Sequence, residues 1–218
     1  MSDHTGRLGG RLPLADPASL TGVRRELFDR MMTTLVPWAD KTGFLSITAD
    51  GRLIGPANAA LLNPAIGAQF LQLQFTVQRH TSLTERVRQV VILTVGAVWR
   101  ADYELYSHSA AARRAGLPDA AIATLVNGGV PGDLTEQEKT AHRLARQLST
   151  SHHVDDVLYR DAERAFGAAG VAEITVLAGI YHTVCGLLKA FAVPAPWPAV
   201  PPASNPVRPQ HDSAGECR

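Results

Sequence analysis

Apolar residues recur every three or four positions through most of the chain, which is the spacing of helices with one buried face. Asp16-Pro17 and Asn63-Pro64 each place a capping residue before a proline, and this pairing is typical of a helix start. Residues 135–138, with the sequence TEQE, form a capping box that predicts another start. Residues 40–55 contain several turn residues and predict an ordered loop.

These signals divide the chain into a series of helices. The predicted helices cover residues 17–37, 64–79, 83–98, 102–115, a short length from 118, 135–148, 157–166 and 171–191. In the helix over residues 64–79, the side chains expected to be buried are those of Phe70, Leu73 and Val77. The pattern as a whole predicts an all-α helical array.

Two of these segments are apolar on most sides. Residues 83–98 favour a central buried helix, although their β-branched residues leave a strand as the alternative. Residues 171–191 are long enough to cross a membrane. His182 lies in the middle of this second segment, Glu173 and Lys189 lie near its ends, and no basic anchor flanks it. We therefore expect a helix buried against other helices or subunits, and no membrane partner.

The remaining composition describes one ordinary domain with two loose ends. Residues 1–15 are rich in Gly and polar groups and predict a flexible N-terminal segment. Half of the fourteen prolines fall between Pro194 and Pro209, so residues 196–218 predict a Pro-rich disordered tail. The helical domain is then expected over residues 16–195.

Charge and cysteine content exclude several functional classes. A formal net charge of +1 lacks the electrostatic footprint of a nucleic-acid-binding or anionic-membrane-binding protein. Cys185 and Cys217 lie too far apart for a C-x-x-C redox pair, and two cysteines are too few for a disulfide framework or a thiolate zinc site. The N-terminus lacks an apolar export signal, so we expect a cytoplasmic protein.

Candidate chemistry is concentrated between Trp99 and His108. Glu104 and His108 are four residues apart on a predicted helix, so their side chains are neighbours. A carboxylate beside an imidazole can fix its tautomer and raise its pKa, which makes the ring a proton donor near neutrality. The alternative is an ordinary solvated pair on a helix surface. Nearby aromatic residues and the small residues at 110–112 favour a partly buried site instead.

Three stretches together resemble the carboxymuconolactone decarboxylase family in order and spacing. They are GRLIGPANAALLNPAIGAQF, TSLTERVRQVVILTVGAVWRADYELYSHSAAARRAGLPDAAI and GIYHTVCGLLKAFAVPAP, and the resemblance covers about residues 20–196. It implies the all-α alkylhydroperoxidase D-like fold and assembly into a homotrimer or homohexamer. The peroxidase branch of this family uses a C-x-x-C pair before the motif histidine and an upstream glutamate. This chain has Ala101, Glu104 and Gln89 at those places, which argues against thiol peroxidase activity.

The decarboxylase branch implies a cofactor-free lyase or isomerase that acts by proton transfer on a small cyclic or conjugated carboxylic acid or lactone. The resemblance implies that His108 is the proton donor and that Glu104 orients and charges it. The alternative is a catalytically silent helical oligomer that binds an apolar ligand or a partner protein. No cofactor is expected in either case.

Four further residues are candidates for substrate binding. Arg100, or Arg52, is suited to hold a substrate carboxylate, although a solvated surface arginine is the alternative. Gln89 can bond a substrate oxygen if it faces the site, and Tyr103 lies beside the motif. His182 is either a second acid or base or a satisfied core histidine. Glu104, His108 and His182 together could ligate a metal, but the E-x-x-H repeats of helical di-iron proteins are absent and no metal is predicted.

Overall fold

The computed structural model describes residues 8–196 and shows an all-α array, as the sequence predicts. Within that range, the only β-type pairing is an isolated antiparallel bridge between Ile47 and Leu53 in the loop before α2. A short 3₁₀ helix, Pro17–Ser19, precedes the α-helices. The α-helices are α1 (Gly22–Thr42), α2 (Pro56–Ala60), α3 (Pro64–His80), α4 (Glu85–Trp99), α5 (Asp102–Arg114), α6 (Asp119–Val126), α7 (Glu136–Thr150) and α8 (Asp156–Ala190).

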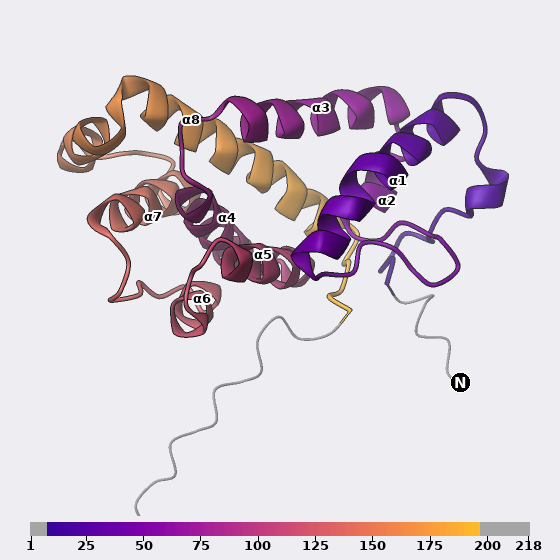
Figure 1. The fold of residues 1–218 in the computed structure, drawn as a ribbon. Helices are drawn as coiled ribbons and strands as arrows, with labels where there is room; N and C mark the ends of the chain where they lie inside the picture. Colours follow the sequence, from indigo (N-terminus) through magenta and orange to yellow (C-terminus); the bar gives the residue numbers. More distant parts are fainter. Residues whose placement is uncertain (1–7, 197–218) are drawn as a thin grey trace, which may run out of the picture.

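Helix α4 is the central element, with contacts to α5, α6, α7 and α8 (Figure 1). The side chains of Val90, Val91, Leu93 and Val95 are fully buried, and each such burial contributes about 1.5–3 kcal/mol. Thr84 caps the helix by accepting a hydrogen bond from the Val87 N–H. The helix prediction for this segment is therefore confirmed, and the strand alternative is wrong because burial on all sides outweighs the β propensity of the valines.

Helices α1 and α3 pack against each other as a layer of two helices, in which α3 lies on the opposite side of α8 from α4 and α1 contacts α5 (Figure 1). The predicted buried face of α3 is confirmed in part: Phe70 and Val77 are half-buried and pack against the main core, whereas Leu73 is 43% exposed. The buried residues of α3 are Gly67 and Leu71. Helix α3 packs mainly against α1, α2 and α8, and most of its residues remain half-buried or exposed.

Helix α1 differs from the prediction at both ends. Asp16 caps the 3₁₀ helix and not α1, which begins five residues further on behind Thr21. The predicted end at Pro37 is also wrong, because α1 continues to Thr42 with the proline inside it. Proline removes one helical hydrogen bond. Burial of the fully enclosed Ala39 and of Val36 offsets that loss.

Helix α8 joins the two helices predicted at 157–166 and 171–191. Gly167 has non-helical angles, φ 67° and ψ 169°, and marks the kink between them. By length and composition alone α8 is apolar enough to cross a membrane, and 44% of its most apolar window is buried inside the protein. It packs along α4 and α7, and Glu173 accepts hydrogen bonds from Thr81 and Ser82 in the turn before α4. These contacts are those of a core helix in a helical array.

The N-terminal prediction needs a partial correction, because residues 8–15 are packed against the domain. The Arg11 N–H donates to the Phe191 carbonyl at 2.6 Å, and the Ala15 N–H donates to Asn58 Oδ1 at 3.0 Å. Leu14 lies in the main core. Residues 1–7 and the predicted tail from residue 197 onward lie outside the described residues, and so does Cys217.

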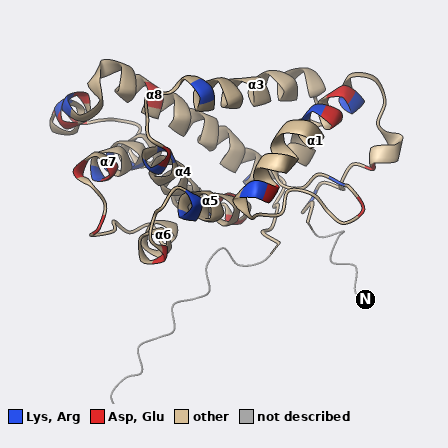
Figure 2. Ribbon diagram, in the orientation of Figure 1, with Lys and Arg blue, Asp and Glu red and all other residues tan. Residues whose placement is uncertain are grey.

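Acidic and basic residues are interspersed along the helices, without one large region of a single sign in the described part of the chain (Figure 2). Arg86 of α4 and Glu138 of α7 form an ion pair at 2.6 Å in which the carboxylate is buried. Glu138 also completes the predicted capping box with Thr135. The start of α7 is thereby fixed to α4.

Candidate functional site

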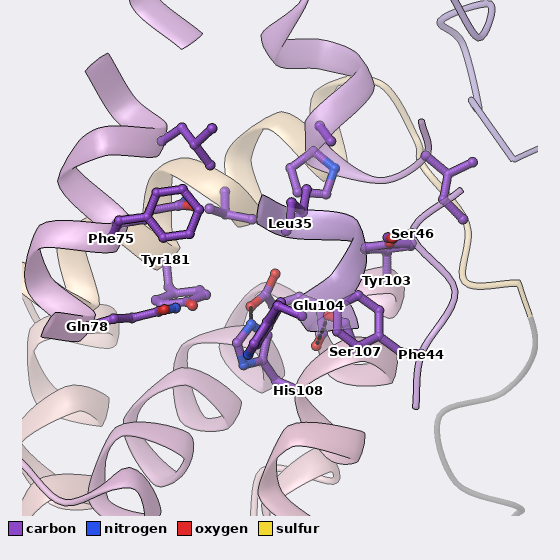
Figure 3. Close-up of a pocket in the computed structure, with 17 residues that line it drawn as sticks. Leu35, Phe44, Ser46, Phe75, Gln78, Tyr103, Glu104, Ser107, His108 and Tyr181 are labelled. Carbon is purple, nitrogen blue, oxygen red and sulfur yellow. Dashed lines mark hydrogen bonds and ion pairs between the residues drawn. The ribbon is translucent and has the colours of Figure 1, made fainter. Parts of the chain in front are cut away.

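A pocket lies between the α1–α3 layer and helices α5 and α8 (Figure 3). The cavity itself is small, about 80 Å³ for the centre of a water molecule, and the empty space there is about 650 Å³ when the open solvent at its mouth is included. Most of its wall is apolar or aromatic, including Trp38, Phe44 and Tyr181. The polar residues that line it, apart from tyrosines, are Ser46, Gln74, Gln78, Glu104, Ser107 and His108. Both members of the predicted acid–base pair are therefore in the wall of this pocket.

Glu104 and His108 lie one turn apart on α5 and contact each other, as the sequence predicts. His108 Nε2 is 3.2 Å from Glu104 Oε1, and their side chains are 7% and 3% exposed. No donor within the protein reaches Glu104 Oε1 with hydrogen-bond geometry, so this buried oxygen accepts no hydrogen bond. Figure 3 shows the two side chains together in the middle of the pocket wall, with the Tyr181 ring beside them.

Gln89 of α4 determines the tautomer of the imidazole. Gln89 Nε2 donates to the carboxylate of Glu85 at 2.9 Å, which turns the amide oxygen toward α5. That oxygen lies 2.8 Å from His108 Nδ1. An amide oxygen only accepts, so Nδ1 carries the proton and Nε2 faces Glu104 with a free lone pair. Gln89 does not line the pocket, so the expectation that it binds substrate directly is wrong.

Burial disfavours the charged form of both members of the pair. It raises the pKa of Glu104 to about 8 and lowers the pKa of His108 to about 3. At neutral pH the pair is a protonated carboxyl group beside a neutral imidazole. The expectation that Glu104 charges the ring is therefore wrong, because desolvation outweighs the attraction between the two groups. The transferable proton is on Glu104.

Two tyrosines of α5 hold the 43–55 loop against the site. The Tyr103 hydroxyl donates to the Leu45 carbonyl at 2.8 Å, and the Leu45 N–H donates to the Tyr106 hydroxyl at 2.8 Å. These bonds fix the backbone between Phe44 and Ser46, and both of those side chains line the pocket. Tyr103 lines the pocket as predicted, but its hydroxyl is already bonded to the loop.

Gly55 at the end of this loop allows the close approach of the Tyr103 ring. Its φ is +67°, and a Cβ atom built there would lie 2.4 Å from a ring carbon of Tyr103. A side chain at this position would displace the ring or the loop. The sequence analysis did not identify this contact, because it joins residues 48 positions apart and no local pattern signals it.

The predicted arginines are not in the pocket wall. Arg100 is exposed at the end of α4 with a φ of 50°, and its carbonyl oxygen accepts a hydrogen bond from Lys189. Arg52 is paired with Asp50 at 2.7 Å and with Asp16 at 3.7 Å on the outer side of the loop. No lysine or arginine is among the described residues that line the pocket. The prediction that either arginine holds a substrate carboxylate is not supported by this geometry.

His182 also lies outside the pocket. Its Nδ1 accepts a hydrogen bond from the Trp99 indole at 2.7 Å, and its Nε2 lies 3.1 Å from the Ser149 hydroxyl. That hydroxyl donates to the Ala145 carbonyl at 2.6 Å, so His182 Nε2 is the donor to it. Both ring nitrogens of His182 are therefore satisfied within the protein, as in the alternative interpretation, although the side chain is half-buried and not part of the core. Among residues 8–196 no group of three His, Cys, Asp or Glu side chains is placed to hold a metal ion.

The cysteine in the described region, Cys185, is unsuited to thiol chemistry. It is fully buried on α8, and burial is the main cause that raises its pKa well above the usual range of a thiol. The two positions where the C-x-x-C pair would stand are Ala101 and Glu104, so neither has a thiol.

Residues 64–147 match the model of the carboxymuconolactone decarboxylase family. The matched segment runs from the start of α3 into α7 and includes the Glu104–His108 pair. The chain carries a carboxymuconolactone decarboxylase family domain. A comparison with curated proteins gives no match.

Several solved structures have a fold similar to that of this chain, and the similarity extends beyond residues 64–147. An uncharacterized peroxidase-related protein from Ralstonia eutropha JMP134, with an alkylhydroperoxidase AhpD core, superposes with a TM-score of 0.68 at 14% identity, covering 85% of this chain and 91% of that one. A cysteine-to-alanine variant of the debrominase Bmp8, in complex with 2,3,4-tribromopyrrole, gives 0.62 at 16% identity, covering 78% and 88%. A protein of unknown function from Agrobacterium tumefaciens gives 0.59 at 19% identity, covering 64% and 97%. At these identities the comparison establishes the AhpD-like fold alone.

Proposed function

We propose that this carboxymuconolactone decarboxylase family protein is a lyase or isomerase that transfers a proton to or from a small cyclic or conjugated substrate. The observation that carries the proposal is the buried Glu104–His108 pair in the wall of an apolar pocket. Glu104 Oε1 has no partner in the protein, and Nε2 of His108 is free to accept a proton. An acid and a base in contact with one cavity are the groups that such chemistry needs.

The pair is suited to two proton transfers. In an isomerisation, His108 Nε2 takes a proton from a substrate carbon beside a carbonyl group, and the carboxyl group of Glu104 returns a proton to another carbon. The imidazolium then passes its proton to the Glu104 carboxylate, whose Oε1 is 3.2 Å from Nε2, and both groups are restored. In a decarboxylation, carbon dioxide leaves its bonding electrons on the ring, Glu104 protonates that carbon, and water restores the proton. Both steps balance without an oxidant, and neither needs a group beyond the side chains present.

Thiol chemistry is a poorer fit to this site. Peroxide reduction by cysteine needs a low-pKa thiolate and a resolving partner, and the pocket wall contains neither. The peroxidase-related and debrominase names belong to structural neighbours below 20% identity. They show that this fold supports other chemistries, and they do not assign one to this chain.

Proton exchange is the direct test. Candidate lactones and cyclic enones are incubated with the protein in D₂O, and deuterium incorporation and product formation are followed by NMR and mass spectrometry. We expect Glu104→Gln and His108→Asn each to slow exchange by about 100-fold or more. Glu136→Gln, on an exposed glutamate of α7, is the matched control and should leave the rate unchanged. Equal rates in all four proteins would refute the assignment, and tight binding without exchange would favour the silent ligand-binding protein.

We also infer that the protein self-associates as a homotrimer or homohexamer. The support is the apolar surface of α8, in which less than half of the most apolar window is buried and Val176 is 48% exposed. Val157 and Leu73 add further exposed apolar surface. Light scattering at micromolar concentration measures the mass directly, and a monomer would contradict the inference.

A further inference from the structure

The pocket holds no positive charge to receive an anionic ligand. None of the 17 residues that line it is a lysine or an arginine, and its histidine is neutral at physiological pH. The acidic side chain in its wall is that of Glu104. A ligand carboxylate bound here would therefore lose its hydrating water, and no lysine or arginine of the pocket wall would replace it. Desolvating an ion costs several kcal/mol unless a counter-charge or several hydrogen bonds compensate.

The same wall presents two buried polar atoms without partners. Ser46 Oγ and Glu104 Oε1 each belong to a residue that is 2% exposed, and neither atom forms a hydrogen bond within the protein. A buried polar group without a partner destabilises a protein by about 1–3 kcal/mol. A ligand that supplies a partner recovers that energy, so these two atoms mark where the polar part of a ligand binds.

The two atoms come from two adjacent elements of the pocket wall. Ser46 belongs to the loop fixed by the α5 tyrosines, and Glu104 belongs to α5 itself (Figure 3). Aromatic rings form the wall nearby, with Trp38 and Phe44 in edge-to-face contact at 5.2 Å between centroids. Flat apolar walls with a few polar atoms suit a planar ring that carries one or two oxygen atoms.

We propose that the pocket takes an uncharged ring compound with a carbonyl or hydroxyl oxygen, and that it discriminates against the corresponding free carboxylate. The Ser46 hydroxyl donates to the ligand oxygen, and Glu104 lies against the ring carbon that exchanges its proton. This inference rests on the proposed function in treating the ligand as a substrate. It narrows the substrate class to lactones and cyclic enones, away from free acids, and therefore favours the isomerisation over the decarboxylation.

Binding of a matched pair of probes tests the preference. Coumarin is an uncharged lactone, and coumarin-3-carboxylate is the same ring with a carboxylate. Isothermal titration at pH 7 should show the lactone binding about tenfold or more tightly, which corresponds to about 1.4 kcal/mol. Ser46→Ala should weaken lactone binding by a similar factor. Carboxylate binding as tight as that of the lactone, or no lactone binding at millimolar concentration, would overturn the proposal.

A cation introduced at the pocket provides the complementary test. Gln78 lines the pocket on α3 and is exposed, so Gln78→Arg should fold and should raise the affinity for the carboxylate by about tenfold. Gln69→Arg, on the same helix and outside the pocket, is the control and should change neither affinity. If Gln78→Arg does not raise the affinity for the carboxylate, the absence of a cation is not the reason why the pocket prefers the lactone. If the wild-type protein prefers the lactone but catalyses no proton exchange, only the proposed function is refuted. If it catalyses exchange but does not prefer the lactone, only this inference is refuted.

Discussion

The buried acid–base pair predicts an unusual pH dependence of folding stability. In the unfolded chain the reference pKa values are 4.5 for Glu104 and 6.5 for His108, and in the folded protein they become about 8 and about 3. The raised carboxyl pKa gives a stabilising contribution that is complete below pH 4.5 and is lost as the pH rises through 8. The lowered imidazole pKa gives a contribution that is complete above pH 6.5 and is lost as the pH falls through 3.

The two contributions cancel over part of the pH range. Between pH 4.5 and 6.5 the folded state keeps a proton on Glu104 and the unfolded state keeps one on His108, so the net slope is close to zero. Above pH 6.5 only the carboxyl contribution changes, and each pH unit changes the free energy of unfolding by about 1.4 kcal/mol. From pH 6.5 to 8 the wild-type protein should therefore lose about 2 kcal/mol of stability.

Urea denaturation followed by circular dichroism at half-unit pH intervals measures this loss. Glu104→Gln removes the titrating carboxyl group and should abolish the decline above pH 6.5. In this variant the imidazole contribution is no longer cancelled, so stability should fall as the pH is lowered below 6.5. Glu136→Gln, on an exposed carboxylate, should reproduce the wild-type profile. A wild-type curve that is flat or rising between pH 6.5 and 8, or the same decline in Glu104→Gln, would refute the protonation states assigned to the pair.

Three further substitutions test the surrounding structure. Gln89→Leu removes the acceptor of the imidazole Nδ1–H and should lower the free energy of unfolding by about 1–3 kcal/mol, measured by urea denaturation. Gly55→Ala forces a Cβ against Tyr103 and should lower the melting temperature far more than Gly43→Ala, which also has a positive φ but open space around it; equal effects would contradict the steric argument. Cys185→Ala should leave proton exchange unchanged, and the native protein should react with a thiol reagent at Cys185 only on unfolding; fast labelling of the folded protein would contradict its burial.

The sequence was sufficient for the helices whose signals are local. The caps at Asn63 and Thr135 predicted the starts of two helices, because a cap needs only the residues of one turn. The end of α1 and the burial of Leu73 on α3 were predicted wrongly. Both depend on which other helices pack against them, and this information is not contained in a local window.

The same division applies to the site. Glu104 and His108 were predicted because four residues on a helix place two side chains together whatever the rest of the chain does. Ser46 and Tyr181 join the pocket from elements far away in sequence, and no spacing links them to α5. The charge of the pair was also predicted wrongly, since the direction of a pKa shift depends on burial and not on the partner alone.

Because the 43–55 loop is a separate segment attached to α5, the residues that shape the pocket and the acid–base pair lie in different parts of the chain. The Glu104–His108 pair lies within residues 64–147, which match the family model, while Ser46 and the aromatic residues Trp38 and Phe44 come from before that segment. Substitutions in the loop can therefore reshape the ligand's surroundings and leave the hydrogen bonds between α4 and α5 untouched. A scaffold organised in this way lets selection or protein engineering exchange one bound molecule for another without rebuilding the acid and the base.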